Sequence, residues 1–305
     1  MRAWPLLAAA IAIASAAAPA ARQQPPFHDD HPFHGGVDLT SITVTVRNAG
    51  GQLVTDLTRE AFQVLEDAEP QTVTAFTHER SPISLGLLLD TSDSMFGKRI
   101  RDARAAVNQF LFELLAPDDE FFITAFNHKP QLLTPWTRDP QVVGRALDAL
   151  KPSGATALYD AVVSALPRID ARAHERAAIV VLTDGADTAS DATMRDVTNA
   201  LRKSDALVYA IAIDSPDPQP INTRVNAAAL AELTSSTGGR VAVVHSSDDL
   251  MTAAADIAQE LNNQYLLGYV STHGADGKYH SIRVRVNGGA DYRVRARTGY
   301  TAIRR

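Results

Sequence analysis

The stretch that decides the fold is ISLGLLLDTSDSM, residues 83–95. Its first part, residues 83–89, is an almost continuous apolar run, as expected for a central parallel strand that is covered on both faces. Its second part places oxygen-bearing side chains at alternate positions: Asp90, Ser92 and Ser94. Open α/β sheets bind ligands at the carboxyl ends of their strands. The stretch therefore predicts a buried strand and, where that strand ends, a ligand site.

The chain around this stretch, residues 82–262, alternates apolar strands with amphipathic helices. This alternation is typical of an α/β domain, and we expect a doubly wound, Rossmann-like fold. The predicted strands are 83–89, 120–126, 131–136, 177–183, 206–213 and 240–244, and the predicted helices are 98–116, 140–150, 157–171, 192–204, 227–236 and 247–262. We expect segment 131–136 to be antiparallel to the strand just before it, and Ser247 to cap the last helix.

The regions on either side of this domain, residues 37–81 and 263–305, change to the period-two alternation of β-strands. Each region is too small to bury a good core alone. We therefore expect the two regions to pair into one small sheet or sandwich, with the α/β domain inserted between them. The strands expected in them are 42–46, 62–65, 72–76, 265–270, 279–286 and 292–297.

The last two of these strands carry arginines at alternate positions, with apolar residues pointing the other way. The arginines are Arg283, Arg285, Arg293, Arg295 and Arg297. One interpretation is a basic sheet face that binds an anionic partner. The other, which we favour, is the solvated face of an antiparallel sheet, whose arginines are countered by nearby Asp or Glu.

The composition limits the classes of function. The chain has 305 residues, of which 45% are hydrophobic, so it is long and apolar enough to form a packed globule. It carries 29 Lys and Arg against 35 Asp and Glu, a formal net charge of −6, which argues against a nucleic-acid-binding protein. It contains no cysteine, which excludes disulfides, thiolate zinc sites, cysteine nucleophiles and a lipid-anchored cysteine.

The N-terminus predicts export. Residues 1–21 combine a positive start, an apolar run too short to span a bilayer and an A-x-A pattern at 18–20, which together are typical of a secretory signal peptide. No later stretch predicts a transmembrane helix, so we expect a secreted or periplasmic protein. Residues 22–36 are rich in Pro, His, Gln and Asp and predict a flexible linker. The linker histidines are His28, His31 and His34, which we expect to be solvated rather than to bind a transition metal.

Two further segments add oxygen donors to the strand-end site. Residues 180–185 place Asp184 at the end of another buried strand, and residues 153–160 place Thr156 in a glycine-containing loop before a helix. Carboxylate and hydroxyl oxygens form a hard donor set, which suits Mg²⁺ or Mn²⁺, with Ca²⁺ as a further candidate. Taken alone, the first loop could instead be a polar loop whose side chains cap the next helix.

These segments, in this order, resemble the von Willebrand factor type A (VWA) domain over residues 82–262. They match its metal-ion-dependent adhesion site position by position: Asp90, Ser92, Ser94, Thr156 and Asp184. The resemblance implies that the serines bind the cation directly and that the threonine and aspartates bind it directly or through water. It also implies that one coordination position is left for an acidic side chain of a protein partner. The flanking β-regions and the signal peptide are similar, more loosely, to bacterial secreted VWFA-related proteins.

The sequence lacks the residues that several other catalytic and metal-binding motifs require. The sequence lacks G-x-S-x-G, H-E-x-x-H, the P-loop motif and G-x-G-x-x-G, and an EF-hand loop starting at Asp90 would have Met95 and Arg101 where Gly and Glu are needed. We therefore expect an exported, metal-dependent adhesion or protein-interaction module that is not an enzyme. Two alternatives remain: a structural subunit of a cell-envelope assembly in which the metal locks the loop, and a metal-dependent hydrolase that activates water at Asp90.

Overall fold

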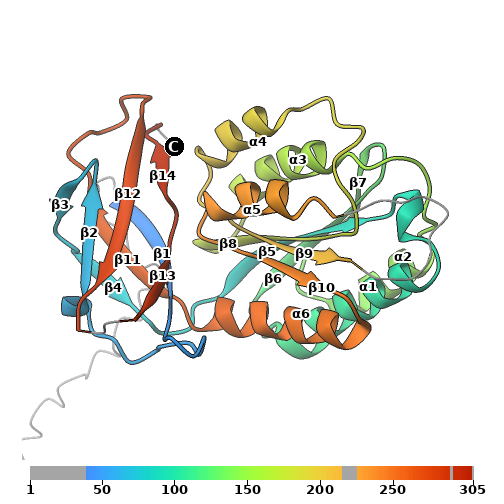
Figure 1. The fold of residues 1–305 in the computed structure, drawn as a ribbon, viewed down its shortest axis with the longest axis horizontal. Coiled ribbons are helices and arrows are strands. Elements are labelled where there is room, and N and C mark those ends of the chain that lie inside the picture. Colours follow the sequence, from blue (N-terminus) through green and yellow to red (C-terminus); the bar gives the residue numbers. More distant parts are fainter. Residues whose placement is uncertain (1–38, 215–224, 289–290, 304–305) are drawn as a thin grey trace, which may run out of the picture. The chain divides into compact units, whose positions relative to one another are not determined.

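A computed structural model describes residues 39–214, 225–288 and 291–303 (Figure 1). The predicted signal peptide, 1–21, and linker, 22–36, lie outside the described residues. Within the described ranges, no helix combines the length and the apolar character needed to cross a membrane. These ranges contain one six-stranded sheet and two four-stranded sheets.

The six-stranded sheet has the order β10-β9-β8-β5-β6-β7. Its strands are β5 (Ile83–Asp90), β6 (Glu120–Phe126), β7 (Pro130–Thr137), β8 (Arg176–Thr183), β9 (Leu207–Ile213) and β10 (Val241–Val244). All neighbouring pairs are parallel except β6 and β7, which are antiparallel as predicted. Every residue of β5, β6, β8 and β9 is buried, which explains why these segments read as continuous apolar runs.

Helices cover both faces of this sheet, which confirms the predicted doubly wound α/β fold (Figure 1). One core packs the sheet against α1 (Lys98–Gln109), α2 (Val143–Asp148) and α6 (Ser247–Asn262). The other core packs it against α3 (Leu158–Asp170), α4 (Met194–Leu201) and α5 (Ala227–Ser235). Short 3-10 turns occur at η1 (Arg59–Ala61), η2 (Asp93–Met95) and η4 (Pro140–Val142), and a π-helical turn, η3, at Phe110–Leu114.

Several helix bounds differ from the prediction, and two of these differences have a clear structural cause. The helix expected over 98–116 leaves α-helical geometry after Gln109 and continues as the π-helical turn. The cap of α6 is Ser246, whose side chain accepts a hydrogen bond from the backbone N–H of Asp249. The assignment of this cap to Ser247 is therefore wrong by one residue, because Ser247 already belongs to the helix and its hydroxyl instead donates to Asp102.

The flanking regions form two antiparallel sheets, ordered β13-β1-β11-β4 and β14-β12-β2-β3. Their strands are β1 (Leu39–Arg47), β2 (Phe62–Glu66), β3 (Glu69–Gln71), β4 (Ala75–Thr77), β11 (Tyr265–Val270), β12 (Tyr279–Val286), β13 (Arg293–Arg295) and β14 (Gly299–Thr301). Both sheets mix strands from before and after the α/β domain, and they share one apolar core that includes Val44, Val64 and Leu267. This confirms the predicted β companion, because neither flank supplies a complete sheet of its own.

The prediction that the five arginines share one sheet face is wrong. The chain changes sheets between β12 and β13, so Arg283 and Arg285 lie exposed in one sheet, whereas Arg293 lies exposed in the other. The remaining two are countered by acids, as the favoured interpretation required: Arg295 pairs with Glu260 and Arg297 with Asp205.

Glu260 is a buried carboxylate on α6 that forms ion pairs with arginines from several elements. Its oxygens also accept from Arg47 on β1, at 3.1 Å, and from Arg240, at 3.2 Å. Although burial raises the pKa of Glu260, the nearby Arg295 guanidinium outweighs it together with the other partners, and the pKa lies below its usual value. The ionised Glu260 thus holds strands of the β companion against the last helix of the α/β domain.

Candidate metal centre

The first predicted ligand, Asp90, is the last residue of β5 and is completely buried. Its Oδ1 accepts a hydrogen bond from the backbone N–H of Ser92, at 2.8 Å, and its Oδ2 accepts one from the hydroxyl of Thr183, at 2.6 Å. Thr183 ends the neighbouring strand β8. Asp90 therefore fixes both the start of its own loop and the end of the next strand.

Burial raises the pKa of Asp90 to about 6, despite the hydrogen bonds from Thr183 and Ser92, which lower it. The negative charge of Asp184 raises it further. The raised pKa indicates that these hydrogen bonds do not fully offset the free-energy cost of burying the ionised carboxylate. A cation placed beside it would restore that compensation.

Two serines connect Asp90's loop to the second predicted carboxylate. The hydroxyl oxygens of Ser92 and Ser94 are 3.0 Å apart, and Ser94 donates to Oδ1 of Asp184 at 2.7 Å. All three side chains are buried. The carboxyl ends of β5 and β8 thus bring together side chains that lie about 90 positions apart in the sequence, as expected for neighbouring parallel strands.

The fifth predicted residue, Thr156, reaches the same place from the loop before α3. A methyl group on Gly185 would lie 3.6 Å from Oγ1 of Thr156 and 4.0 Å from Oγ of Ser94, so both hydroxyls border the space beside that glycine. The backbone N–H of Thr156 donates to the hydroxyl of Thr188, at 3.0 Å, which anchors the loop. We call Asp90, Ser92, Ser94, Thr156 and Asp184 the oxygen site.

One residue at this site was missed by the sequence analysis. Arg99, in the first turn of α1, is buried, forms an ion pair with Oδ2 of Asp184 and donates to the backbone oxygen of Ser94 at 3.3 Å. Its spacing from Ala103 and Ala106 places it on the buried side of the helix. An arginine on that side is the signal that could have revealed it, since a buried charge needs a partner.

One family of known proteins matches the part of the chain that contains the oxygen site. Residues 85–186, which include all five members of the oxygen site, match the family described as von Willebrand factor type A domain. This part of the chain is a VWA domain. No curated protein matches the chain.

Solved structures share the fold of the VWA domain. A von Willebrand factor type A protein from Catenulispora acidiphila has a TM-score of 0.53 at 11% identity, covering 88% of this chain and 75% of its own. An aerotolerance-related membrane protein from Bacteroides fragilis has a TM-score of 0.51 at 22% identity, covering 59% and 98%. The D319A mutant of the PilB minor pilin from Streptococcus sanguinis has a TM-score of 0.50 at 12% identity, covering 61% and 63%. At these identities the likeness shows the fold alone.

The donor set of the VWA domain fits a hard divalent cation. It consists of two carboxylates and three hydroxyls, all of them buried, and hydroxyl oxygens keep acceptor capacity for an ion even while they donate hydrogen bonds. Because both oxygens of Asp90 and both of Asp184 already accept hydrogen bonds or an ion pair, the hydroxyls of Ser92, Ser94 and Thr156 are the more available ligands.

The surface beside the oxygen site carries an apolar side chain. Phe96 directly follows η2 and is 69% exposed, although its neighbour Met95 is completely buried. The loop itself is held in place, because the backbone N–H of Asp93 donates to the oxygen of Gly154, at 2.9 Å, and that of Ser153 donates to the oxygen of Thr91, at 2.9 Å. Phe96 is therefore presented to solvent on an anchored loop.

Proposed function

We propose that this chain is an exported, non-enzymatic interaction module, whose VWA domain holds Mg²⁺ at the oxygen site and binds an acidic side chain of a protein partner through that ion. Mn²⁺ and Ca²⁺ are the alternative ions. The observation that carries the proposal is the convergence of hydroxyl and carboxylate oxygens from three separate segments at one end of the parallel sheet. The signal-peptide pattern of residues 1–21 supports export.

The charges at the oxygen site favour an acidic partner. Arg99 already neutralises Asp184, so Asp90 is the one carboxylate of the site whose charge is left for a divalent ion. An ion held mainly by neutral hydroxyls keeps excess positive charge. A partner carboxylate can supply the missing negative charge through a charge-assisted contact. The exposed ring of Phe96 adds an apolar contact of the kind that anchors protein interfaces.

Metal binding is tested by thermal unfolding of the chain with and without MgCl₂, for wild type, Asp90→Asn and Asp93→Asn. Asp93 is the matched control, because it is an exposed carboxylate in the same loop. At 100 times its Kd, Mg²⁺ should stabilise wild type and Asp93→Asn by about 2.7 kcal/mol. Asp90→Asn should lose this gain. An unchanged melting temperature of wild type, or an equal gain in Asp90→Asn, would contradict the proposal.

Partner binding is tested by capture from cell-envelope extract, comparing wild type with Asp90→Asn in MgCl₂ and wild type in EDTA. A partner that is captured only by wild type in MgCl₂, and not by Asp90→Asn or by wild type in EDTA, supports binding through the ion. A partner that all three samples retain would instead support a structural subunit whose metal merely locks the loop. The first result also predicts that carboxylate-to-amide changes in the partner abolish capture.

A further inference from the structure

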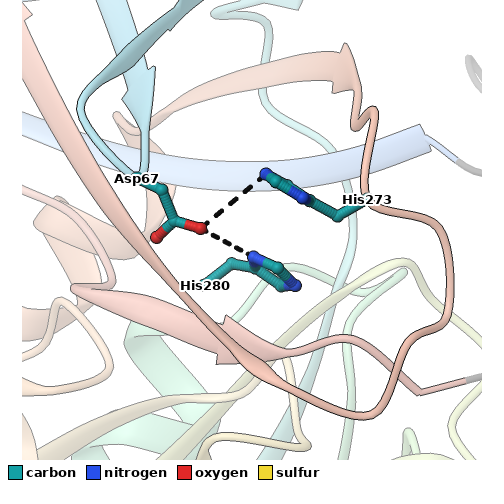
Figure 2. Close-up of side chains that lie close together, drawn as sticks. All are labelled: Asp67, His273 and His280. Atoms are coloured by element: carbon teal, nitrogen blue, oxygen red, sulfur yellow. Dashed lines mark hydrogen bonds and ion pairs between the residues drawn. The ribbon is translucent and has the colours of Figure 1, made fainter.

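A second group of metal-ligating side chains lies in the β companion, outside the oxygen site. Asp67 stands in the turn between β2 and β3, His273 in the loop between β11 and β12, and His280 in β12 (Figure 2). One ligand atom from each lies within 4.8 Å of the others. We call these three residues the histidine site. They come from both flanks of the chain, more than 200 positions apart, and the β2–β12 pairing brings them together.

Both imidazoles direct a nitrogen at the same carboxylate oxygen. Nδ1 of His280 is 2.7 Å from Oδ2 of Asp67, and Nε2 of His273 is 3.7 Å from it (Figure 2). The two rings stack with their centroids 4.1 Å apart and their planes 18° apart. Ligand atoms around a tetrahedral Zn²⁺, each about 2.0–2.1 Å from the ion, are roughly 3.4 Å apart. The two separations observed here, 2.7 Å and 3.7 Å, lie on either side of that value.

Groups behind the site orient two of its members. The other nitrogen of His280, Nε2, is 3.1 Å from Oδ1 of Asp276. The other oxygen of Asp67, Oδ1, accepts from the backbone N–H of Ser281, at 2.8 Å, and from its hydroxyl, at 3.0 Å. Metal-binding histidines usually donate their remote N–H to a carboxylate, which leaves the near nitrogen unprotonated for the ion. Asp276 and Ser281 would hold His280 and Asp67 in this way.

The charge around the histidine site favours a cation. Glu66 is completely buried next to it, and one of its oxygens is 3.9 Å from Nε2 of His273. Its oxygens accept from the hydroxyls of Tyr269, Ser271 and Tyr300, so Glu66 is already well hydrogen-bonded and adds mainly negative charge. Three carboxylates therefore surround two imidazoles. This is the electrostatic setting of a cation site.

We propose that Asp67, His273 and His280 bind a divalent transition-metal ion of the Zn²⁺ class, with Asp276 orienting His280. Two imidazole nitrogens and one carboxylate oxygen suit Zn²⁺, Ni²⁺ or Cu²⁺ and not the hard ions of the oxygen site. Three protein ligands leave a fourth position for water or for another ligand. The ion would link the β2–β3 turn to the β11–β12 loop and so stabilise the β companion.

The test is calorimetric titration of the metal-stripped chain with ZnCl₂ in excess Mg²⁺, with Co²⁺ absorption as a second readout of the ligand geometry. Four variants are compared: His273→Ala, Asp276→Asn, Asp90→Asn and a linker variant that combines His28→Ala, His31→Ala and His34→Ala. His273 lies in an exposed loop, so its replacement leaves the core intact.

Wild type, Asp90→Asn and the linker variant should each bind one Zn²⁺ tightly, and His273→Ala should not. Asp276→Asn should weaken binding about 10–100-fold, as the loss of an orienting carboxylate does in metal sites. The tetrahedral Co²⁺ absorption bands should appear in wild type and be lost in His273→Ala. Binding that survives in His273→Ala, or that disappears in the linker variant, would overturn the proposal. So would the absence of tight binding by wild type, which would make the cluster an ion-pair network only.

Discussion

The oxygen site and the histidine site differ in burial, in donor atoms and in their place in the fold. The oxygen site is largely buried at the carboxyl ends of two neighbouring parallel strands and offers carboxylates and hydroxyls. The histidine site offers imidazoles on the turns of antiparallel sheets, and side chains of both Asp67 and His273 are more than one-third exposed. Hard oxygens and softer nitrogens favour different ions. Our two proposals therefore assign partner recognition to the oxygen donors and stabilisation of the β companion to the imidazole donors.

Arg99→Met should have the largest effect and bears on the oxygen site alone. In EDTA it leaves Asp184 as a buried carboxylate without its arginine, which should cost about 3–5 kcal/mol of unfolding free energy. Mg²⁺ should recover part of this loss, because the ion supplies positive charge beside the same carboxylate. The measurement is urea unfolding with and without MgCl₂. A loss below 1 kcal/mol in EDTA would show that the Arg99 pair is not what compensates Asp184.

The matched variant for this prediction is Arg80→Met. Arg80 also pairs with a buried carboxylate, that of Asp119, at 2.6 Å. That pair does not involve the oxygen site, so Mg²⁺ should not restore the stability that Arg80→Met loses. A similar recovery in both variants would indicate that Mg²⁺ acts generally and not at the oxygen site.

The two sites were unequally visible in the sequence. Asp90, Ser92 and Ser94 were found because they follow one another at alternate positions after a buried strand. Thr156 and Asp184 could be added because they stand in short motifs that the VWA family shares. The loop of Asp90 and the end of β8 are neighbours because β5 and β8 are adjacent parallel strands. Both strands could be predicted, since continuous apolar runs identify central parallel strands.

The histidine site has no such local motif. Asp67 meets His280 only because Glu66 on β2 pairs with Ile282 on β12, and that register depends on the folded β companion. The sequence showed alternating strands in both flanks but not which strands share a sheet, because period two fixes the two faces of a strand and not its partner. The same gap placed β12 and β13 wrongly in one sheet.

The pH dependence of stability should distinguish the metal-free histidine site from its metal-bound form. The hydrogen bond from His280 lowers the pKa of Asp67 to about 2. Burial alone would lower the pKa of His280, but Asp67 and Asp276 outweigh it and raise the pKa above its usual value. Asp67 therefore contributes stability above about pH 4 and loses it as the pH falls towards 2. His280 contributes fully below about pH 6.5 and loses it as the pH rises through its higher folded value.

Without metal, the stability difference between wild type and Asp67→Asn should thus be largest between about pH 4 and 6.5 and smaller at pH 8. Because Asp67 is 39% exposed, the difference should be about 1 kcal/mol or less. With Zn²⁺ this pH trend should reverse, and the stability difference should be larger at pH 8 than at pH 5. The reason is that the ion needs unprotonated imidazoles and binds more tightly at pH 8. The measurement is urea unfolding at pH 5 and pH 8, with a chelator and with ZnCl₂. The same trend with chelator and with ZnCl₂ would show that Zn²⁺ does not bind at the histidine site.

Phe96→Ala should have the smallest effect on stability and sharpens the assignment of recognition to the oxygen site. The ring is 69% exposed, so its removal should change the unfolding free energy by no more than about 0.5 kcal/mol. Mg²⁺ binding should also be unchanged, because the side chain supplies no oxygen. Capture of the Mg²⁺-dependent partner should nevertheless weaken, since exposed aromatic rings beside a polar contact supply much of the energy of an interface.

The matched control for Phe96→Ala is Phe112→Ala. Phe112 is also a surface phenylalanine of the VWA domain, 47% exposed, but it lies in the π-helical turn after α1 and not in the loop of the oxygen site. Its replacement should leave capture intact. Equal weakening in the two variants would mean that the partner reads apolar surface generally. Weakening in neither would mean that the ion and its partner carboxylate carry the contact without help from the loop that presents them.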